Sequence, residues 1–307
     1  MADFSFLKNE FTQKWIISAP RRSHRTNMDG ATPTCPFCPG LEKENSELYR
    51  VGGEFGDSNW RILTIANKFP FTPHHEIVIH STDHHKNFDE LPFSQVELIF
   101  QTYKERFLVN KKKGDVYIFH NRGHSAGESI PHPHTQIAVV PNKVVLEIQP
   151  LPSMVTKAQK SHSGLFRRFA RTNSDILTTE QFMLFCPETS EWPDEVWLAP
   201  KKAGKMFGEI TDVQLTDLAF AFSRLIQIFD LRHGQEFPFN FYIYPGKNWY
   251  LRMIPRIKIL GGFELGTGIM VNTQKPKETM AFIKEHFWEP DHEKIRTEHR
   301  AKFAKSV

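Results

Sequence analysis

The sequence predicts an α+β protein built on antiparallel sheet, and two observations carry this prediction. Strand-like runs follow one another through short turns, which favours antiparallel pairing over a doubly wound parallel sheet. One set of signals, a strand followed by a helix and then by further strands, occurs twice along the 307 residues. A chain of this length can bury a full core and can form two domains.

Alternation of apolar residues and helical spacing define the elements of the first half. Strands are predicted at 12–20, 60–67, 76–80, 115–119 and 135–140. Between the third and fourth of these strands, apolar side chains at helical spacing predict a helix over 94–108, with Val96, Ile99, Phe100, Tyr103 and Phe107 on one face. A loop rich in Gly and Ser at 121–131 separates the last two strands.

The second half repeats this plan. Glu76-Ile-Val-Ile and Gln95 match Glu195-Val-Trp-Leu and Gln214 at a constant offset. Thr211 and Gln214 form a capping-box pattern before a second helix. Its apolar face carries Leu215, Leu218, Ala219, Phe222, Leu225, Ile226 and Phe229. Further strands are predicted at 242–244 and 250–254. We expect two domains, at 1–160 and 175–307, with a basic linker within 153–178.

Composition is that of an ordinary globular protein. The net charge of +4 is too small to indicate a dedicated nucleic-acid binder, although it suits an anionic small substrate. Three cysteines and an N-terminus unlike a signal peptide predict a reducing, cytoplasmic location. No apolar run approaches the ~20 residues needed to span a membrane, so no membrane partner is expected.

The most informative motif is His132-Pro-His134-Thr-Gln136, followed by the apolar run Ile-Ala-Val-Val. On a strand, the three polar side chains would share one face. Imidazoles crowded at a loop-to-strand junction suit a metal site, a nucleophile site, or both. The second half has no histidine between His233 and His286, so only the first half is equipped for imidazole chemistry.

Cys35-Pro-Phe-Cys38 can be half of a zinc site, a redox pair, or neither. A tetrahedral zinc needs two further ligands, for which His84 or His85 and His132 are candidates. Alternatively, His84 and His85 are solvated loop residues without a metal-binding role. Cys186 stands alone in a strand-like run, and we expect it in the core.

A Gly/Ser segment, Gly123-His-Ser-Ala-Gly127-Glu-Ser129, lies directly before the histidine motif. Small residues let backbone amides approach a phosphate. Arg22 and Arg25 can add charge-assisted hydrogen bonds, although a basic turn is usually just solvated. Neither a Walker nor a Rossmann fingerprint is present.

His134 is the better nucleophile of the pair. A neutral imidazole can attack phosphorus and form a phosphoramidate, which divides a group transfer into two in-line steps. The other ring nitrogen then needs an acceptor, for which a backbone carbonyl is suitable. Gln136 can hold an oxygen of the phosphate without supplying a competing proton, and Ser129 with its loop amides can stabilise charge.

These residues together resemble the galactose-1-phosphate uridylyltransferase family, in the transferase branch of the histidine-triad superfamily. The resemblance runs through nearly the whole chain. It rests on the histidine motif and on Trp15-Ile-Ile-Ser-Ala-Pro-Arg-Arg22-Ser-His-Arg25, Cys35-Pro-Phe-Cys38, Asn67-Lys-Phe-Pro, Asp83-His84-His85-Lys86, Asn121-Arg-Gly, Ser129 and Gly262-Phe-Glu264.

The resemblance implies two histidine-triad-like domains, each an antiparallel sheet with packed helices. It also implies double-displacement nucleotidyl transfer, with His134 as the covalent nucleophile and Gln136 as its partner. It implies a Zn²⁺ held by Cys35, Cys38, His84 and His132, and Pro133 then marks a change of chain direction. Substrate contacts are implied at Arg22, Arg25, Asn67, Asn121, Gly127 and Ser129. A homodimer is also implied, in which the segment with Lys258, Phe263 and Glu264 completes the partner's site.

The chain departs from the family pattern at several positions. Tyr250 and Arg252 stand where the second half of better-known members carries a further His-x-His, so that iron site is absent. Lys68 replaces a common Asp, Glu128 replaces a usual Cys, and a sugar-phosphate-reading Gln is missing near Met270.

The expected activity is uridylyl transfer between a nucleotide sugar and a hexose 1-phosphate. One alternative is an adenylyl-transferring phosphorylase that acts on an ADP-sugar or a dinucleoside polyphosphate. An alternative of another class is a non-catalytic nucleotide- or RNA-binding zinc module.

Overall fold

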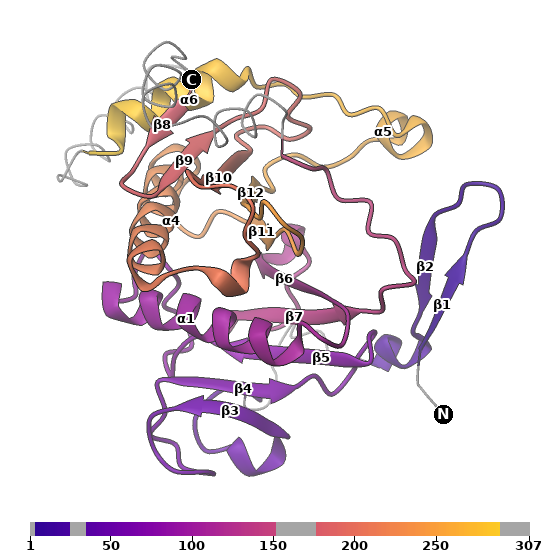
Figure 1. Cartoon of the computed structure of the whole chain (residues 1–307), viewed down its shortest axis with the longest axis vertical. Helices are drawn as coiled ribbons and strands as arrows, with labels where there is room; N and C mark the ends of the chain where they lie inside the picture. Colours follow the sequence, from indigo (N-terminus) through magenta and orange to yellow (C-terminus); the bar gives the residue numbers. More distant parts are fainter. Residues whose placement is uncertain (1–3, 25–34, 152–175, 289–307) are drawn as a thin grey trace.

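The computed structural model describes residues 4–24, 35–151 and 176–288, and Figure 1 shows their arrangement. A long sheet runs through the molecule, and two helices cover one of its faces. Arg25 and most of the predicted linker lie outside the described residues. No helix in the described ranges is long and apolar enough to cross a membrane.

Ten strands form the sheet, and every neighbouring pair is antiparallel. The first half of the chain supplies β3 (Glu47–Val51), β4 (Ile62–Ala66), β5 (His74–Ile79), β6 (Asp115–Arg122) and β7 (His134–Val140). The second half supplies β8 (Ile176–Thr178), β9 (Phe182–Phe185), β10 (Val196–Pro200), β11 (Phe239–Ile243) and β12 (Leu251–Pro255).

The strand order shows the duplication directly. The first half runs β3-β4-β5-β7-β6, and the second half, read from its own edge, runs β8-β9-β10-β12-β11. The expectation that each half forms its own sheet is corrected, because β6 pairs with β11 from Ile118↔Ile243 to Arg122↔Phe239. This pairing removes two exposed strand edges, which would otherwise invite aggregation. The antiparallel α+β class is as predicted.

The two long helices lie where the apolar spacing predicts them. They are α1 (Phe93–Asn110) and α4 (Asp212–His233), which pack against each other on one face of the sheet. Thr211 caps α4 by accepting a hydrogen bond from the Gln214 amide at 3.3 Å. Between helices and sheet lies one continuous apolar core that includes Phe100, Phe222 and Phe241. The high Phe content of the sequence supplies this core.

The sequence repeat is displaced by one residue in one strand. Glu76 faces α1, because it accepts hydrogen bonds from Arg106 and Asn110 at 2.7–2.8 Å. Val196 faces the helices, so Glu195, its neighbour, faces away from them and contacts Arg252. The constant sequence offset therefore aligns the two helices correctly, but it pairs residues of β5 with residues of the β10 segment that lie on the opposite face of the sheet.

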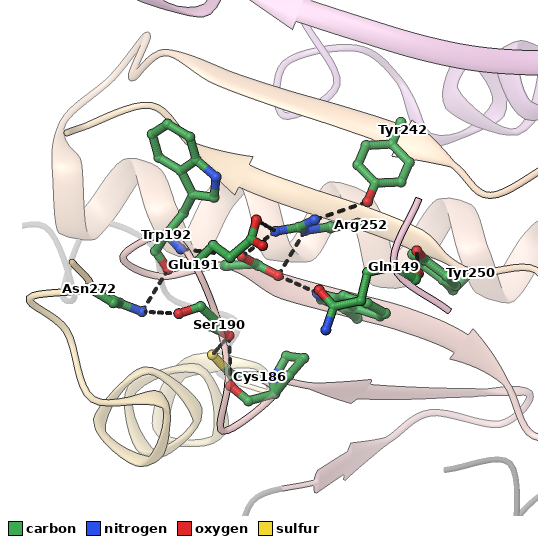
Figure 2. A network of polar contacts seen from close by, with 12 residues as sticks. Gln149, Cys186, Ser190, Glu191, Trp192, Tyr242, Tyr250, Arg252 and Asn272 are labelled. Carbon is green, nitrogen blue, oxygen red and sulfur yellow. Dashed lines mark hydrogen bonds and ion pairs between the residues drawn. The ribbon is translucent and has the colours of Figure 1, made fainter. Parts of the chain in front are cut away.

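On the face away from the helices, the second half carries an arginine network in place of histidines. Figure 2 shows Arg252 of β12 reaching towards Tyr242 and Glu191, at 3.1 and 3.2 Å. Its guanidinium also donates to the fully buried Glu195 at 2.8 Å. On this face β12 presents Arg252.

The remaining elements lie around the sheet. A separate hairpin of β1 (Ser5–Lys8) and β2 (Trp15–Ser18) projects from the body, and short 3-10 helices are η1 (Pro20–His24), η2 (Glu42–Glu44), η3 (His124–Ala126) and η4 (Phe207–Glu209). The helices α5 (Gly262–Thr267) and α6 (Pro276–His286) follow β12. The strand predicted at 12–20 is shorter than expected, since η1 begins at Pro20. The predicted linker ends too late, because β8 begins at Ile176.

Candidate active site and metal centre

The histidine motif divides at Pro133. His134 begins β7, whereas His132 precedes the strand and turns towards the cysteine loop. The carbonyl of Pro133 accepts a hydrogen bond from the His80 amide at 3.1 Å, which anchors this change of direction. Thr135 faces the helices and contacts Tyr103, so His134 and Gln136 share the opposite face.

Cys35, Cys38, His84 and His132 converge, with all four ligand atoms within 4.8 Å of one another. Cys38 Sγ lies 3.3 Å from His84 Nδ1 and 3.6 Å from His132 Nδ1, and Cys35 Sγ lies 3.9 Å from His132 Nδ1. Ligands of a tetrahedral zinc with ordinary Zn–S and Zn–N bonds are about 3.6 Å apart. The donor set and its spacing therefore fit Zn²⁺, as the sequence predicts.

The surroundings of the cluster favour metal ligation by neutral imidazoles. Burial lowers the pKa of His132 to about 4 and also lowers the pKa of His84. The second ring nitrogen of His132, Nε2, donates to the Ser81 carbonyl at 2.9 Å, which leaves Nδ1 free to bind metal. Burial raises the pKa of the Cys35 thiol to about 11, and a bound cation would reverse this by stabilising the thiolate.

The imidazole of His134 is held in one orientation by its neighbours. Its Nδ1 donates to the His132 carbonyl at 2.8 Å, so Nε2 is the unprotonated nitrogen. The ring packs edge-on against Phe37 at 5.0 Å and is only 6% exposed. His134 lines a cavity of about 200 Å³ together with Gln136, Asn67, Ser129 and Phe37.

A chain of polar contacts runs along one wall of this cavity. The Gln136 amide oxygen lies 3.0 Å from His75 Nε2, and this nitrogen lies 3.2 Å from the Asn67 amide nitrogen. Asn67 is fixed in turn, because its amide oxygen accepts from the Phe69 backbone at 2.9 Å. His75 was missed from the sequence. The sequence signal that could have identified His75 is its position two residues before Ile77 on β5, which puts both side chains on the cavity side of the strand.

The other predicted substrate contacts of the first half, Arg22, Asn121 and Gly127, do not themselves line the cavity. Arg22 stacks over Phe71 at 4.8 Å and donates to the Phe69 carbonyl at 2.7 Å, next to the cavity wall. Asn121 lies on β6, which extends beyond its predicted end, and its amide approaches the Gly127 carbonyl at 3.4 Å. Gly127 has a φ of 84°, which glycine adopts without strain.

The predicted C-terminal residues lie elsewhere. Lys258, Phe263 and Glu264 belong to an arm that carries α5 away from the sheet (Figure 1). Lys258 Nζ bonds Glu264 Oε1 at 2.5 Å, and Phe263 is 55% exposed. None of the three lines the cavity beside His134. Lys258 lines a separate hollow of about 570 Å³ with Asp194, Arg232 and His233.

Known proteins with related sequences support a common origin. Residues 72–140 match the family model described as galactose-1-phosphate uridyl transferase, N-terminal domain. An ADP-glucose phosphorylase of Arabidopsis thaliana is 24% identical, over 91% of this chain and 92% of its own. A galactose-1-phosphate uridylyltransferase of Thermotoga maritima is 22% identical, over 90% and 96%, and one of Haemophilus influenzae is 26% identical, over 76% and 75%.

Solved structures share the fold. The Arabidopsis thaliana ADP-glucose phosphorylase with bound ADP-glucose superposes with a TM-score of 0.68 at 24% identity, covering 92% of this chain and 98% of its own. A structure named uridylyltransferase gives 0.71 at 22% identity, over 92% and 98%. The matched region contains the histidine motif and His84. The chain belongs to the galactose-1-phosphate uridylyltransferase family of the histidine-triad superfamily, whose enzymes carry out nucleotidyl transfer or phosphorolysis.

Proposed function

We propose that this enzyme transfers a nucleoside monophosphate from a nucleotide sugar through a covalent intermediate on His134. The observation that carries the proposal is the geometry of that imidazole. Its Nδ1 proton is committed to the His132 carbonyl, while the ring lines a cavity together with Gln136 and Ser129. A neutral, oriented imidazole of this kind is suited to in-line attack on phosphorus.

The first displacement forms the bond between His134 Nε2 and the α-phosphorus and breaks the bond from that phosphorus to the bridging oxygen. The sugar 1-phosphate leaves with the bonding electrons. The ring becomes positively charged, and the carbonyl of His132 stabilises that charge through Nδ1–H. In the second displacement, an acceptor phosphate oxygen attacks the same phosphorus, and the N–P bond breaks to regenerate neutral His134.

Gln136 stabilises the phosphoryl group in this scheme. Its amide can donate to a non-bridging oxygen, and it has no proton to lose at neutral pH. Contact with His75 holds the amide in place. Asn67 and Arg22 are the proposed contacts for the rest of the nucleotide, with Asn121, Gly127 and Ser129 around the phosphates. Arg25 is proposed from the sequence alone.

Zinc has a structural part here. Cys35, Cys38, His84 and His132 would hold it, and it would fix the cysteine loop against β7. Phe37, between the two cysteines, packs on His134, so the loop's position also sets the orientation of that ring.

Uridylyl transfer to a hexose 1-phosphate is the first version that we propose. The second version is phosphorolysis of an ADP-sugar, in which inorganic phosphate is the acceptor. It is supported by the ADP-glucose phosphorylase of Arabidopsis thaliana, which aligns over nearly the full length of both chains. Both versions share the step on His134.

A labelled panel tests the proposal. The purified protein is incubated with UDP-glucose or ADP-glucose carrying ³²P at the α-phosphate, and label on the protein is measured after acid and after base. A phosphoramidate is lost in acid and survives base. Absence of protein-bound label with both donors would contradict the mechanism. Adding glucose 1-phosphate, galactose 1-phosphate or phosphate then identifies the acceptor by which one discharges the label.

We also propose a homodimer. The arm between β12 and α6 exposes apolar side chains that a monomer would leave in water, among them Ile259 (86%), Leu265 (72%) and Ile269 (60%). A second copy of this chain would cover them. In that dimer, Lys258, Phe263 and Glu264 of each protomer would lie near the active site of the other protomer. Light scattering that reports a monomer at micromolar concentration would contradict this part.

A further inference from the structure

A row of asparagines connects the active site to the second half of the chain. In the register of β6 and β7, Phe119 pairs with Gln136 and His120 pairs with Thr135. The same register, continued by one residue, brings Asn121 opposite His134. Asn121 pairs in turn with Asn240 of β11. Since neighbouring strands are about 4.8 Å apart, Asn121 lies one strand and Asn240 two strands from the nucleophile.

Asn240 holds both Asn121 and the Gly/Ser loop. Its amide nitrogen donates to Asn121 Oδ1 at 2.8 Å and to the Ala126 carbonyl at 2.8 Å. An amide nitrogen has two protons, so these bonds use both of them. With its oxygen occupied, Asn121 presents Nδ2 as a donor, and among the described residues that group has one long contact, with the Gly127 carbonyl at 3.4 Å.

Arg256 sets the orientation of Asn240. Its guanidinium donates to Asn240 Oδ1 at 2.8 Å and stacks over Trp192 at 4.5 Å. This charge-assisted bond fixes which end of the Asn240 amide faces Asn121. The backbone reinforces the arrangement, because the Arg256 carbonyl accepts from Ser125 Oγ of the loop at 3.4 Å.

Partial burial of the Arg256 guanidinium is unfavourable for folding. Burial lowers its pKa, its Nε is buried without a hydrogen-bond partner, and no carboxylate in the described residues forms an ion pair with it. Arg256 is half-buried; the buried Arg106 and Arg252 have carboxylate partners, and the buried Arg224 donates to two backbone carbonyls. An incompletely satisfied cation beside an active-site loop points to a role in function.

We propose that Arg256 and Asn240 are positioning residues, which orient Asn121 and the Gly/Ser loop towards the phosphate that His134 attacks. This inference rests on the proposed function and extends it. The half without a His-x-His motif thereby contributes to the reaction across the β6–β11 junction. The aligned donor is the Asn121 amide, which would bind a non-bridging oxygen more tightly as charge develops there.

The test compares Arg256→Gln, Asn240→Ala and the double variant, with Lys277→Gln as a control that removes one exposed positive charge from α6. Nucleotide-sugar affinity and the single-turnover rate of label transfer to the protein are measured separately. A misplaced donor slows transfer by about 10- to 100-fold. Affinity changes by no more than about twofold, because the effect is on the transition state. The double variant is no slower than Asn240→Ala, since both changes break one relay.

Asn240→Asp provides a second route if a variant folds poorly. Its carboxylate still accepts from Arg256 but has no proton for Asn121 Oδ1, so transfer slows as in Asn240→Ala. A wild-type transfer rate in a folded Arg256→Gln or Asn240→Asp protein would overturn the inference, as would independent, multiplying effects of the two substitutions. If the wild-type protein takes no label, the proposed function fails instead.

Discussion

His134 Nδ1 lies 2.8 Å from the backbone oxygen of His132, a residue that turns away to the metal cluster. The proposed nucleophile and the proposed metal ligand are thus joined by one hydrogen bond within a three-residue segment. A backbone acceptor cannot be removed by mutation of its side chain, so this bond fixes the imidazole tautomer robustly.

His134→Gly is expected to abolish label transfer from a nucleotide sugar, because the substitution removes the imidazole whose Nε2 would form the N–P bond. A loss of about 10³-fold or more in rate is the expected scale for a covalent nucleophile. Quantifying protein-bound ³²P measures it. His74→Gln, which removes an exposed histidine from the adjacent β5, should label normally. Labelling of His134→Gly at the wild-type rate would rule out this nucleophile.

Gln136→Glu tests the second part of the motif. A carboxylate beside a phosphate repels it, and the transition state loses an amide donor, so the transfer rate should fall by about 10²-fold. His75 faces this position at 3.0 Å and would gain an acidic neighbour. The rate of label transfer to the protein, measured in quenched reactions over a pH series, tests this prediction. A rate that does not depend on this substitution would remove Gln136 from the mechanism.

Metal content provides the third prediction. One zinc per chain is expected, and Cys38→Ser should lower both the zinc stoichiometry and the thermal midpoint, because two of the closest ligand contacts involve Cys38 Sγ. Elemental analysis and a melting curve measure these quantities. Cys186→Ser is the matched control, since that thiol lies beside Ser190 and outside the cluster. Full zinc occupancy in Cys38→Ser would contradict the ligand assignment.

Local spacing indicates the Cys35–Cys38 pair but leaves His84 and His85 open, and the full set of four follows from the family resemblance. These four side chains lie together in one cluster. His75 could not be identified in this way, because a single histidine on a strand has no distinguishing spacing. Its importance depends on strand pairing, which brings Ile77 opposite Gln136.

Local sequence patterns also could not predict that the two halves share one sheet. The β6–β11 pairing joins residues more than a hundred positions apart, and neither strand has a signal that names its neighbour. The displaced repeat has a similar cause. Helical matches fix an offset, but a strand reverses its face with each residue, so an error of one position moves Glu195 to the other side of the sheet.

Stability should depend on pH through Glu42, which is 5% exposed. Burial raises its pKa, but hydrogen bonds from Trp60, its own backbone, Gly40 and Ser58 outweigh burial, and the pKa is lowered overall. A lowered pKa means that this stabilisation is present above the unfolded value of about 4.3 and is lost as the pH falls through the folded pKa.

Glu42→Gln should therefore lower the free energy of unfolding by about 1–3 kcal/mol at pH 7, because an amide nitrogen would face two donors. The difference from wild type should shrink below about pH 4, as the wild-type carboxylate also takes up a proton. Urea unfolding across this range measures it. A difference that grows on acidification would reverse the sign and contradict the assignment.

The last prediction concerns the arginine network of the second half (Figure 2). Arg252→Met leaves Glu195, which is fully buried, without its cation, and this should cost about 3–5 kcal/mol of unfolding free energy. Arg252→Met combined with Glu195→Gln removes both charges and should recover part of the loss. Single-turnover labelling at His134, measured on folded protein, should stay within about twofold of wild type, since no hydrogen bond joins Arg252 or Glu195 to Asn121, Asn240 or Arg256 in the described residues. The two groups of residues meet at Trp192, whose amide donates to Glu195 and whose ring lies beneath Arg256. A large fall in labelling without loss of stability would show that the arginine network acts in the reaction, and the second half would then contribute more than the Arg256–Asn240 pair.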